Sequence, residues 1–382
     1  MNPKGNHNMT QETLVFFYDK KTAGTRVLLE AAQPAAIPIL SALVTRLVAD
    51  IRCRSVCVLA NNVAADALRN TIDEQKLPLV EIDKKPGIIE DIPGPFDAAL
   101  GILGTANSPS QLVLFSAKSV FGCKKLYFVA SGPSAPVLLV STRGNRDPID
   151  KIFVDDPVAA ELHQADMPWV PAADIVPVGT ALLDAICRAD AATLRRLGRK
   201  KLGLADDDRV LLYTNFPGDG HPSRSAKTLE ETLAGVATAG MPFAVIVRPH
   251  PRMTPQELAA CDSICDNSAV QVVKDPLRAS YEESIYAADA VACPAGSTYT
   301  VLAPYYGRTA LVFAYAGEGM SGDIFRAVFP PSKAAALERI RGITVVHDST
   351  AVARALKEAR PFEPQKPVQG DSTQTILGYL LS

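Results

Sequence analysis

Short apolar segments alternate with helix-forming segments along most of this chain of 382 residues, and this alternation limits the fold more than any other feature of the sequence. Apolar runs of this length, divided by helices, are typical of a parallel sheet covered on both faces. We therefore predict an α/β protein. The expected strands are 13–18, 26–30, 56–59, 98–103, 126–130, 152–154, 210–214, 243–247, 270–273, 290–292, 310–313 and 343–346.

The alternation stops and restarts once, which indicates two domains. The segment 188–203 is charged and favours a helix, and it follows a break in the pattern near 178–184. The length of the chain also exceeds what one hydrophobic core usually serves. We predict two Rossmann-like doubly wound domains that face a cleft: an acceptor-side domain at 1–182 and a nucleotide-binding domain at 190–360. An extended tail with a closing helix occupies 361–382.

Composition and charge narrow the class of protein. Hydrophobic residues make up 47% of the chain and charged residues 21%, which is typical of a globular protein. The formal net charge of -2 does not indicate a basic surface that would bind a polyanion, so no nucleic-acid partner is expected. The seven cysteines form no Cys-x-x-Cys pair, and no apolar run has the roughly 18 residues that span a bilayer. We expect a cytoplasmic protein without a transmembrane segment, and leave a peripheral membrane contact open.

Polar residues follow several expected strands of the second domain. Ligands of open parallel sheets bind beyond the carboxyl ends of the strands. Asn215 follows the first of these strands, Arg248 and His250 follow the second, and the turn Gly296-Ser297-Thr298 follows the fourth. A cationic turn and a Gly-Ser-Thr turn that opens a helix are both ways to bind phosphate. The matching positions in the first domain are weaker, so we predict that a nucleotide-type ligand binds mainly to the second domain.

Each of these residues also has a structural interpretation. His250 could close a turn between two prolines, Arg248 could be a solvated surface residue, and Ser297 with Thr298 could cap a helix. Capping is compatible with phosphate binding, because both use the free N–H groups of the first helical turn. Asp219 and His221 lie in the loop after the first strand of the second domain, and we predict that they are the catalytic residues.

At this point the chain resembles the two-Rossmann-domain superfamily that holds the GT-B type glycosyltransferases and the UDP-N-acetylglucosamine 2-epimerases. The pairing of Arg248-Pro249-His250-Pro251 with Gly296-Ser297-Thr298 is similar to motifs of bacterial sialyltransferases, 3-deoxy-octulosonate transferases and glycerophosphotransferases. In those families such residues hold the phosphates of a cytidine nucleotide, and in the epimerases similar positions hold UDP. The resemblance therefore implies that His250, Ser297 and Thr298 bind the phosphates of the donor.

The resemblance has two departures. The opening arginine-containing glycine turn of the epimerases is at best echoed by Gly24-Thr25-Arg26, with no matching acid nearby. Many members carry a ribose-binding glutamate in the helix after the serine turn, whereas 300–304 here contains no carboxylate. This leaves three functional hypotheses. The first is a metal-independent glycosyltransferase that moves a sugar from a CMP- or UDP-linked donor to a glycan or other acceptor in surface polysaccharide or glycoconjugate synthesis. The second is a sugar-nucleotide 2-epimerase, and the third is a binding protein of the same fold. No cofactor is expected, because the nucleotide-sugar is itself a substrate.

Overall fold

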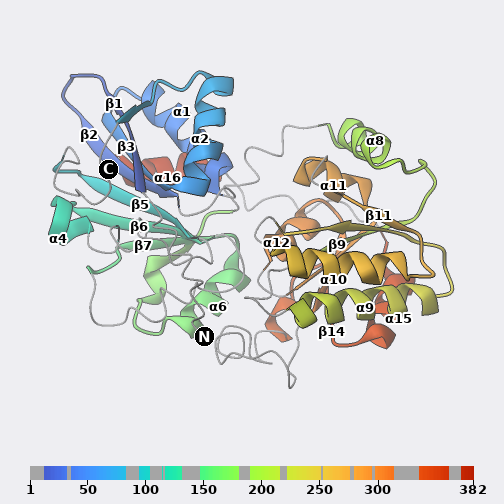
Figure 1. The fold of residues 1–382 in the computed structure, drawn as a ribbon. Helices are drawn as coiled ribbons and strands as arrows, with labels where there is room; N and C mark the ends of the chain where they lie inside the picture. The colour runs from blue at the N-terminus through green and yellow to red at the C-terminus, as the bar shows by residue number, and fades with distance from the viewer. Residues whose placement is uncertain are drawn as a thin grey trace, which may run out of the picture.

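The protein is represented by a computed structural model of the full chain. It describes residues 13–31, 36–82, 94–103, 114, 117–130, 147–179, 190–215, 222–250, 253–275, 279–294, 297–313, 335–360 and 371–382. Two sheets with their own covering helices form the molecule (Figure 1). The residue boundaries that the sequence predicts for the two domains remain predictions.

The first sheet has the strand order β4-β1-β3-β2-β5-β6-β7-β8. Its strands are β1 (Thr13–Asp19), β2 (Thr25–Ala31), β3 (Cys53–Asn61), β4 (Val80–Ile82), β5 (Ala98–Leu103), β6 (Lys125–Ala130), β7 (Lys151–Val154) and β8 (Ile175–Pro177). From β3 to β8 the neighbouring strands are parallel, and the strand order reverses between β2 and β5.

Strand β1 departs from the expected parallel arrangement, because it runs antiparallel to both β3 and β4. The turn 20–24 joins β1 to β2, and the two strands lie on opposite sides of β3. The N–H of Lys20 donates to Arg54 O at 3.0 Å, and the N–H of Thr25 donates to Arg52 O at 2.7 Å. A parallel partner would need a crossover of about a dozen residues, which this turn does not supply.

Helices cover both faces of the first sheet. These are α1 (Ile37–Ala49), α2 (Asn62–Gln75), α4 (Ala117–Phe121), α6 (Pro157–Asp166), the 3-10 turn η3 (Ala172–Asp174) and the C-terminal α16 (Ser372–Leu380). Although α16 is last in the chain, it packs against α1 and β5 of this first unit (Figure 1). The ring of Tyr379 lies 5.1 Å from the ring of Phe153 and 6.1 Å from that of Tyr127.

The second sheet is entirely parallel and has the order β11-β10-β9-β12-β13-β14. Its strands are β9 (Val210–Thr214), β10 (Ala244–Arg248), β11 (Val272–Lys274), β12 (Ala290–Pro294), β13 (Thr309–Phe313) and β14 (Ile343–Val346). The chain starts in the middle at β9, moves outward to β11, and then returns to the other side of β9. The strand order therefore reverses between β9 and β12, which is where such sheets bind ligands.

Two layers of helices enclose the second sheet. The helices are α8 (Ala191–Leu202), α9 (Pro222–Thr238), α10 (Pro255–Asp266), α11 (Tyr281–Ala287), α12 (Thr298–Tyr305) and α15 (Ser349–Glu358). Residues of α9, α10 and α15 share one hydrophobic cluster on one face of the sheet, while α11 and α12 contribute to the cluster on the other face. A bidentate ion pair between Arg339 and Glu161, with N···O distances of 2.7 and 3.0 Å, links this unit to α6.

Each strand expected from the apolar runs is present, with ends that differ by a few residues. Strands β4 and β8 were missed. Of the three residues of β4, Val80 is 68% exposed, so burial imposes no apolar run there. The alternation of short strands with helices was therefore enough to predict the two α/β sheets.

Candidate functional site

The carboxyl ends of three adjacent strands place Asn215, Arg248 and Ser297 at the same edge of the second sheet. Strand β9 lies between β10 and β12. Arg248 is paired with Thr214 across β10 and β9, and Tyr213 is paired with Ala292 across β9 and β12. The segments that follow these three strands therefore start side by side at the point where the strand order reverses.

Arg248 is the last residue of β10 and uses one of its nitrogens within the chain. Its Nη1 donates to Asp275 Oδ2 at 2.8 Å, to Ala279 O at 2.9 Å and to Ser284 Oγ at 2.8 Å. Among the described residues, Nε and Nη2 of Arg248 have no hydrogen-bond acceptor. The Arg248 side chain is 13% exposed, so Arg248 is not a solvated surface residue. Because Nε and Nη2 have no acceptor among the described residues, its hydrogen-bond donors are not all used within the protein either.

Thr214 lies beside Arg248 on the same face of the sheet and was not predicted as a site residue. It is 3% exposed, and its Oγ1 is buried without a hydrogen-bond partner. At the end of the neighbouring strand β12, the hydroxyl of Thr300 lies 3.5 Å from both Cys293 Sγ and Pro294 O. A buried hydroxyl without a partner costs about 1–3 kcal/mol. Such an unpartnered group at the strand reversal indicates a position for a ligand atom.

Ser297 caps the helix that follows β12. Its Oγ accepts the N–H of Tyr299 at 3.3 Å, and α12 begins at the next residue. The first turn of α12 contains no acidic side chain that could compensate the partial positive charge of the helix N-terminus. The partial positive charge at the start of α12 is therefore available to a phosphate group. Gly296 and the side chain of Thr298 lie outside the described residues.

The Asn215 side chain and the main chain of His250 make contacts that do not involve the Arg248 side chain. The Asn215 side chain is buried: Oδ1 accepts the Tyr213 hydroxyl at 3.1 Å, and Nδ2 donates to Cys261 Sγ of α10 at 3.1 Å. His250 is half-buried, and its carbonyl oxygen accepts the N–H of Met253 at 3.0 Å, in the turn that leads to α10. The phosphate-binding roles of both residues stay predictions.

The predicted catalytic residues Asp219 and His221 lie outside the part of the chain that the structure describes. Within the first sheet, the structure reveals two acids at strand ends that the sequence analysis passed over. Glu30 is 0% exposed at the end of β2, and Asp155 is 3% exposed directly after β7. The apolar run around Glu30 predicts a buried strand and gives no separate indication of a site. A carboxylate within such a run is nevertheless a candidate functional residue.

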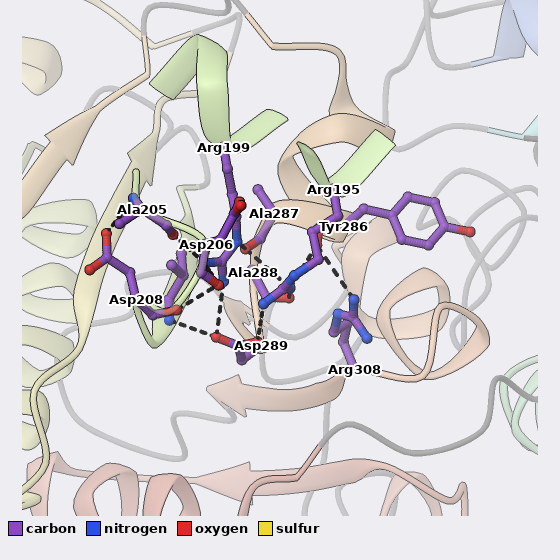
Figure 2. Close-up of polar contacts among 11 residues, drawn as sticks. Arg195, Arg199, Ala205, Asp206, Asp208, Tyr286, Ala287, Ala288, Asp289 and Arg308 are labelled. Carbon is purple, nitrogen blue, oxygen red and sulfur yellow. Dashed lines mark hydrogen bonds and ion pairs between the residues drawn. The ribbon is translucent and has the colours of Figure 1, made fainter. Parts of the chain in front are cut away.

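A second polar cluster lies at the opposite, amino-terminal edge of the second sheet (Figure 2). Arg195 Nη2 lies 2.9 Å from Asp289 Oδ1, and Arg199 Nη2 lies 3.4 Å from Asp289 Oδ2. The remaining donors of Arg199 reach main-chain oxygens, which are those of Ala205, Asp206, Asp208 and Ala287. Burial lowers the pKa of the Arg199 guanidinium, and the charge of Arg195 lowers it further.

This cluster has a structural function. The arginines satisfy carbonyl oxygens at the C-terminal end of α11, where the helix carries a partial negative charge. Asp289 also accepts the N–H of Val210 at 2.8 Å, so the cluster joins α8 and α11 to the start of β9. Because ligands bind at the carboxyl edge of such sheets, we assign the cluster to stability.

Two negative findings apply only to the described residues. No group of three or more His, Cys, Asp or Glu side chains there is arranged to hold a metal ion. None of the described helices combines the length and the apolar character needed to cross a membrane.

Comparison with known proteins supports the fold. No family model and no curated protein matches the sequence. Among solved structures, UDP-GlcNAc 2-epimerase from Neisseria meningitidis, bound to UDP-GlcNAc, is similar with a TM-score of 0.62 and 12% identity over 93% of this chain and 99% of the other. The S. aureus MnaA-UDP co-structure gives a TM-score of 0.64 and 12% identity over 93% and 96%.

The wall teichoic acid polymerase TagF is also similar, with a TM-score of 0.53 and 13% identity over 93% of this chain and 88% of the other. At these identities the likeness concerns the fold alone. The predicted fold, with two Rossmann-like α/β domains of GT-B type, is confirmed, and so is the predicted likeness to the epimerases at the level of structure.

Proposed function

We propose that the protein is a glycosyltransferase that uses a nucleotide-sugar donor, linked to CMP or UDP, and that it binds the donor phosphates at the carboxyl edge of the second sheet. One observation carries the proposal. The unused donors of Arg248, the unpartnered hydroxyl of Thr214 and the start of α12 at Ser297 lie at the carboxyl ends of three adjacent strands, where the strand order reverses. In this fold that arrangement suits a phosphate group.

The proposed chemistry needs a site that stabilises a leaving phosphate. As the bond between the anomeric carbon and the phosphate oxygen breaks, the electron pair moves to that oxygen, and the acceptor oxygen bonds to the carbon. Arg248 and the N-terminus of α12 would stabilise the growing negative charge through donors that are already in place. The acceptor loses its proton to a base, for which Asp219 and His221 stay the predicted residues. The proposed acceptor is a glycan of a surface polysaccharide or another glycoconjugate.

A sugar-nucleotide 2-epimerase is the second candidate. It is favoured by the TM-scores, which are 0.62 for the UDP-GlcNAc 2-epimerase from Neisseria meningitidis and 0.53 for TagF. Epimerisation needs acids and bases that converge on the sugar, and the first sheet carries two buried acids, Glu30 and Asp155, at its strand ends. The same phosphate site serves both candidates.

Calorimetry with UDP, CDP and the corresponding nucleosides tests the shared part of the proposal. We expect the diphosphates to bind more tightly than uridine and cytidine. Arg248→Gln should weaken diphosphate binding by about ten-fold, because a charge-assisted hydrogen bond is worth roughly 1.5–3 kcal/mol. Arg209→Gln is the matched control, since Arg209 lies at the opposite edge of the same sheet and stacks on Phe243. Equal losses in the two variants would contradict the site.

Incubation of the protein with UDP- and CMP-linked sugars separates the candidate functions. Nucleotide release that requires an acceptor supports transfer, and an isomerised donor supports epimerisation. Tight binding without turnover supports a binding protein of the same fold. Transfer or epimerisation that persists unchanged in Arg248→Gln would show that the chemistry takes place elsewhere.

A further inference from the structure

The carboxylate of Asp275 lies next to Arg248 at the end of β11. Val247 is paired with Lys274 across β10 and β11, so the residues that follow them, Arg248 and Asp275, are neighbours. The N–H of Asp275 donates to Val247 O at 3.0 Å, which fixes the main chain at this point. The Asp275 side chain is 0% exposed, so its charge is compensated within the protein.

The contacts of Asp275 fix one end of the Arg248 guanidinium. Asp275 Oδ2 accepts from Arg248 Nη1 at 2.8 Å and from Ser284 Oγ at 3.3 Å. Ser284 Oγ itself accepts from Nη1 at 2.8 Å and lies 3.0 Å from Ser280 O within α11. Arg248 is therefore attached through one nitrogen to both β11 and α11.

This attachment leaves the Nε–Nη2 edge of the Arg248 guanidinium available to a ligand. A guanidinium is planar, so three acceptors on Nη1 also define the direction of Nε and Nη2. The Nε–Nη2 edge matches two oxygens of a phosphate in a bidentate contact. Asp275 lies on the β11 side of Arg248, whereas Thr214 lies on the β9 side, toward the strand reversal.

We propose that Asp275 is a positioning residue, which holds Nη1 of Arg248 and thereby presents the Nε–Nη2 edge to a phosphate of the nucleotide. Ser284 is the second anchor of the same nitrogen. The inference rests on the proposed function and adds to it a residue that does not touch the ligand. The alternative is that the ion pair only stabilises the end of β11.

A double-mutant cycle distinguishes these two roles. Its readout is the ratio of the diphosphate affinity to the nucleoside affinity, measured by calorimetry with UDP and uridine and with CDP and cytidine. This ratio reports the phosphate contact and is insensitive to a general loss of stability. We expect Asp275→Asn to lower the ratio by about five- to ten-fold, because it releases a charge-assisted bond to Arg248. In the Arg248→Gln background the same change should alter the ratio less than about two-fold.

Two further variants complete the experiment. Asp262→Asn is the control, since Asp262 forms an exposed ion pair with Lys274 beside β11 and should leave the ratio unchanged. Ser284→Ala removes an anchor without leaving a buried charge unpaired, and it should lower the ratio by about two- to three-fold if Asp275→Asn does not fold.

The outcomes separate this inference from the proposed function. If the wild-type protein binds UDP and CDP no better than the nucleosides, the proposed function fails. If the wild-type protein prefers the diphosphates and both Asp275→Asn and Ser284→Ala keep the full ratio, the proposed function stands and the positioning role is overturned. An equal loss for Asp275→Asn in both backgrounds also overturns it, because the effect would not pass through Arg248.

Discussion

The two edges of the second sheet use arginine in different ways. At the amino-terminal edge, Arg199 is 1% exposed and every nitrogen of its guanidinium has an acceptor within the chain. At the carboxyl edge, Arg248 donates through Nη1 alone. An arginine that uses all its donors internally has a structural function, whereas one that is fixed at one end and unused at the other is suited to a ligand.

Arg308 lies between these two cases. It belongs to the amino-terminal edge, where its Nη2 reaches Tyr286 O at 3.4 Å, yet its Nε is buried without a partner. Burial lowers the pKa of Arg308, and the charge of Arg195 lowers it further. A variant of Arg308 therefore tests which feature indicates a ligand-binding arginine: unused hydrogen-bond donors, or a position at the carboxyl edge of the sheet.

The largest effect is expected from Arg199→Met. The change leaves Asp289 with less compensation and removes the donors of four main-chain oxygens, so it should lower the free energy of unfolding by about 3–5 kcal/mol. Urea denaturation measures the loss. Lys200→Met is the control, because Lys200 is exposed on the same helix and should change stability by no more than about 0.5 kcal/mol. A loss of less than about 1 kcal/mol in the free energy of unfolding for Arg199→Met would contradict the structural function of Arg199.

A smaller effect of opposite sign is expected from Thr214→Val. The change replaces an unpartnered buried hydroxyl by a methyl group, so the free energy of unfolding should stay the same or rise by about 1 kcal/mol. Affinity for UDP or CDP should fall several-fold at the same time. Thr232→Val is the matched control, because the Thr232 hydroxyl donates to Thr228 O at 2.8 Å and its removal should destabilise the protein. Destabilisation by Thr214→Val would show that its hydroxyl has a partner in solution.

The smallest effect is expected from Arg308→Gln. The change removes one weak hydrogen bond and also the repulsion between Arg308 and Arg195, so the free energy of unfolding should shift by less than about 1 kcal/mol. Binding of UDP and CDP should not change. A clear loss of diphosphate affinity in this variant would mean that the amino-terminal edge takes part in binding, and the distinction between the two edges would no longer hold.

The sheets can be predicted from the sequence more completely than the site. Buried strands appear in a sequence as apolar runs, but the direction of a strand does not, so β1 was expected in a parallel sheet and is antiparallel. Arg248 and Ser297 are predicted as site residues because polar residues after apolar runs mark strand ends, and their roles stay predictions. The sequence predicts Thr214 as the end of an apolar strand, and a threonine there gives no sign that its hydroxyl lacks a partner.

Asp275 could not be assigned from the sequence for a different reason. It follows Lys274, and either residue could have faced Arg248. Only the pairing of Val247 with Lys274 decides that the aspartate is the neighbour of Arg248. Contacts of this kind depend on strand register, which adjacent residues in the sequence do not encode.

The position of α16 has a consequence for the synthesis of the chain. Ile376, Leu377 and Leu380 of this last helix are buried in a hydrophobic cluster with residues of α1 and of the first sheet, and Arg46 of α1 forms an ion pair with Asp371. The first sheet precedes the second sheet in the chain, but one of the helices that cover it, α16, is translated only after the second sheet. Until α16 has left the ribosome, the apolar surface that it covers on the first unit stays exposed.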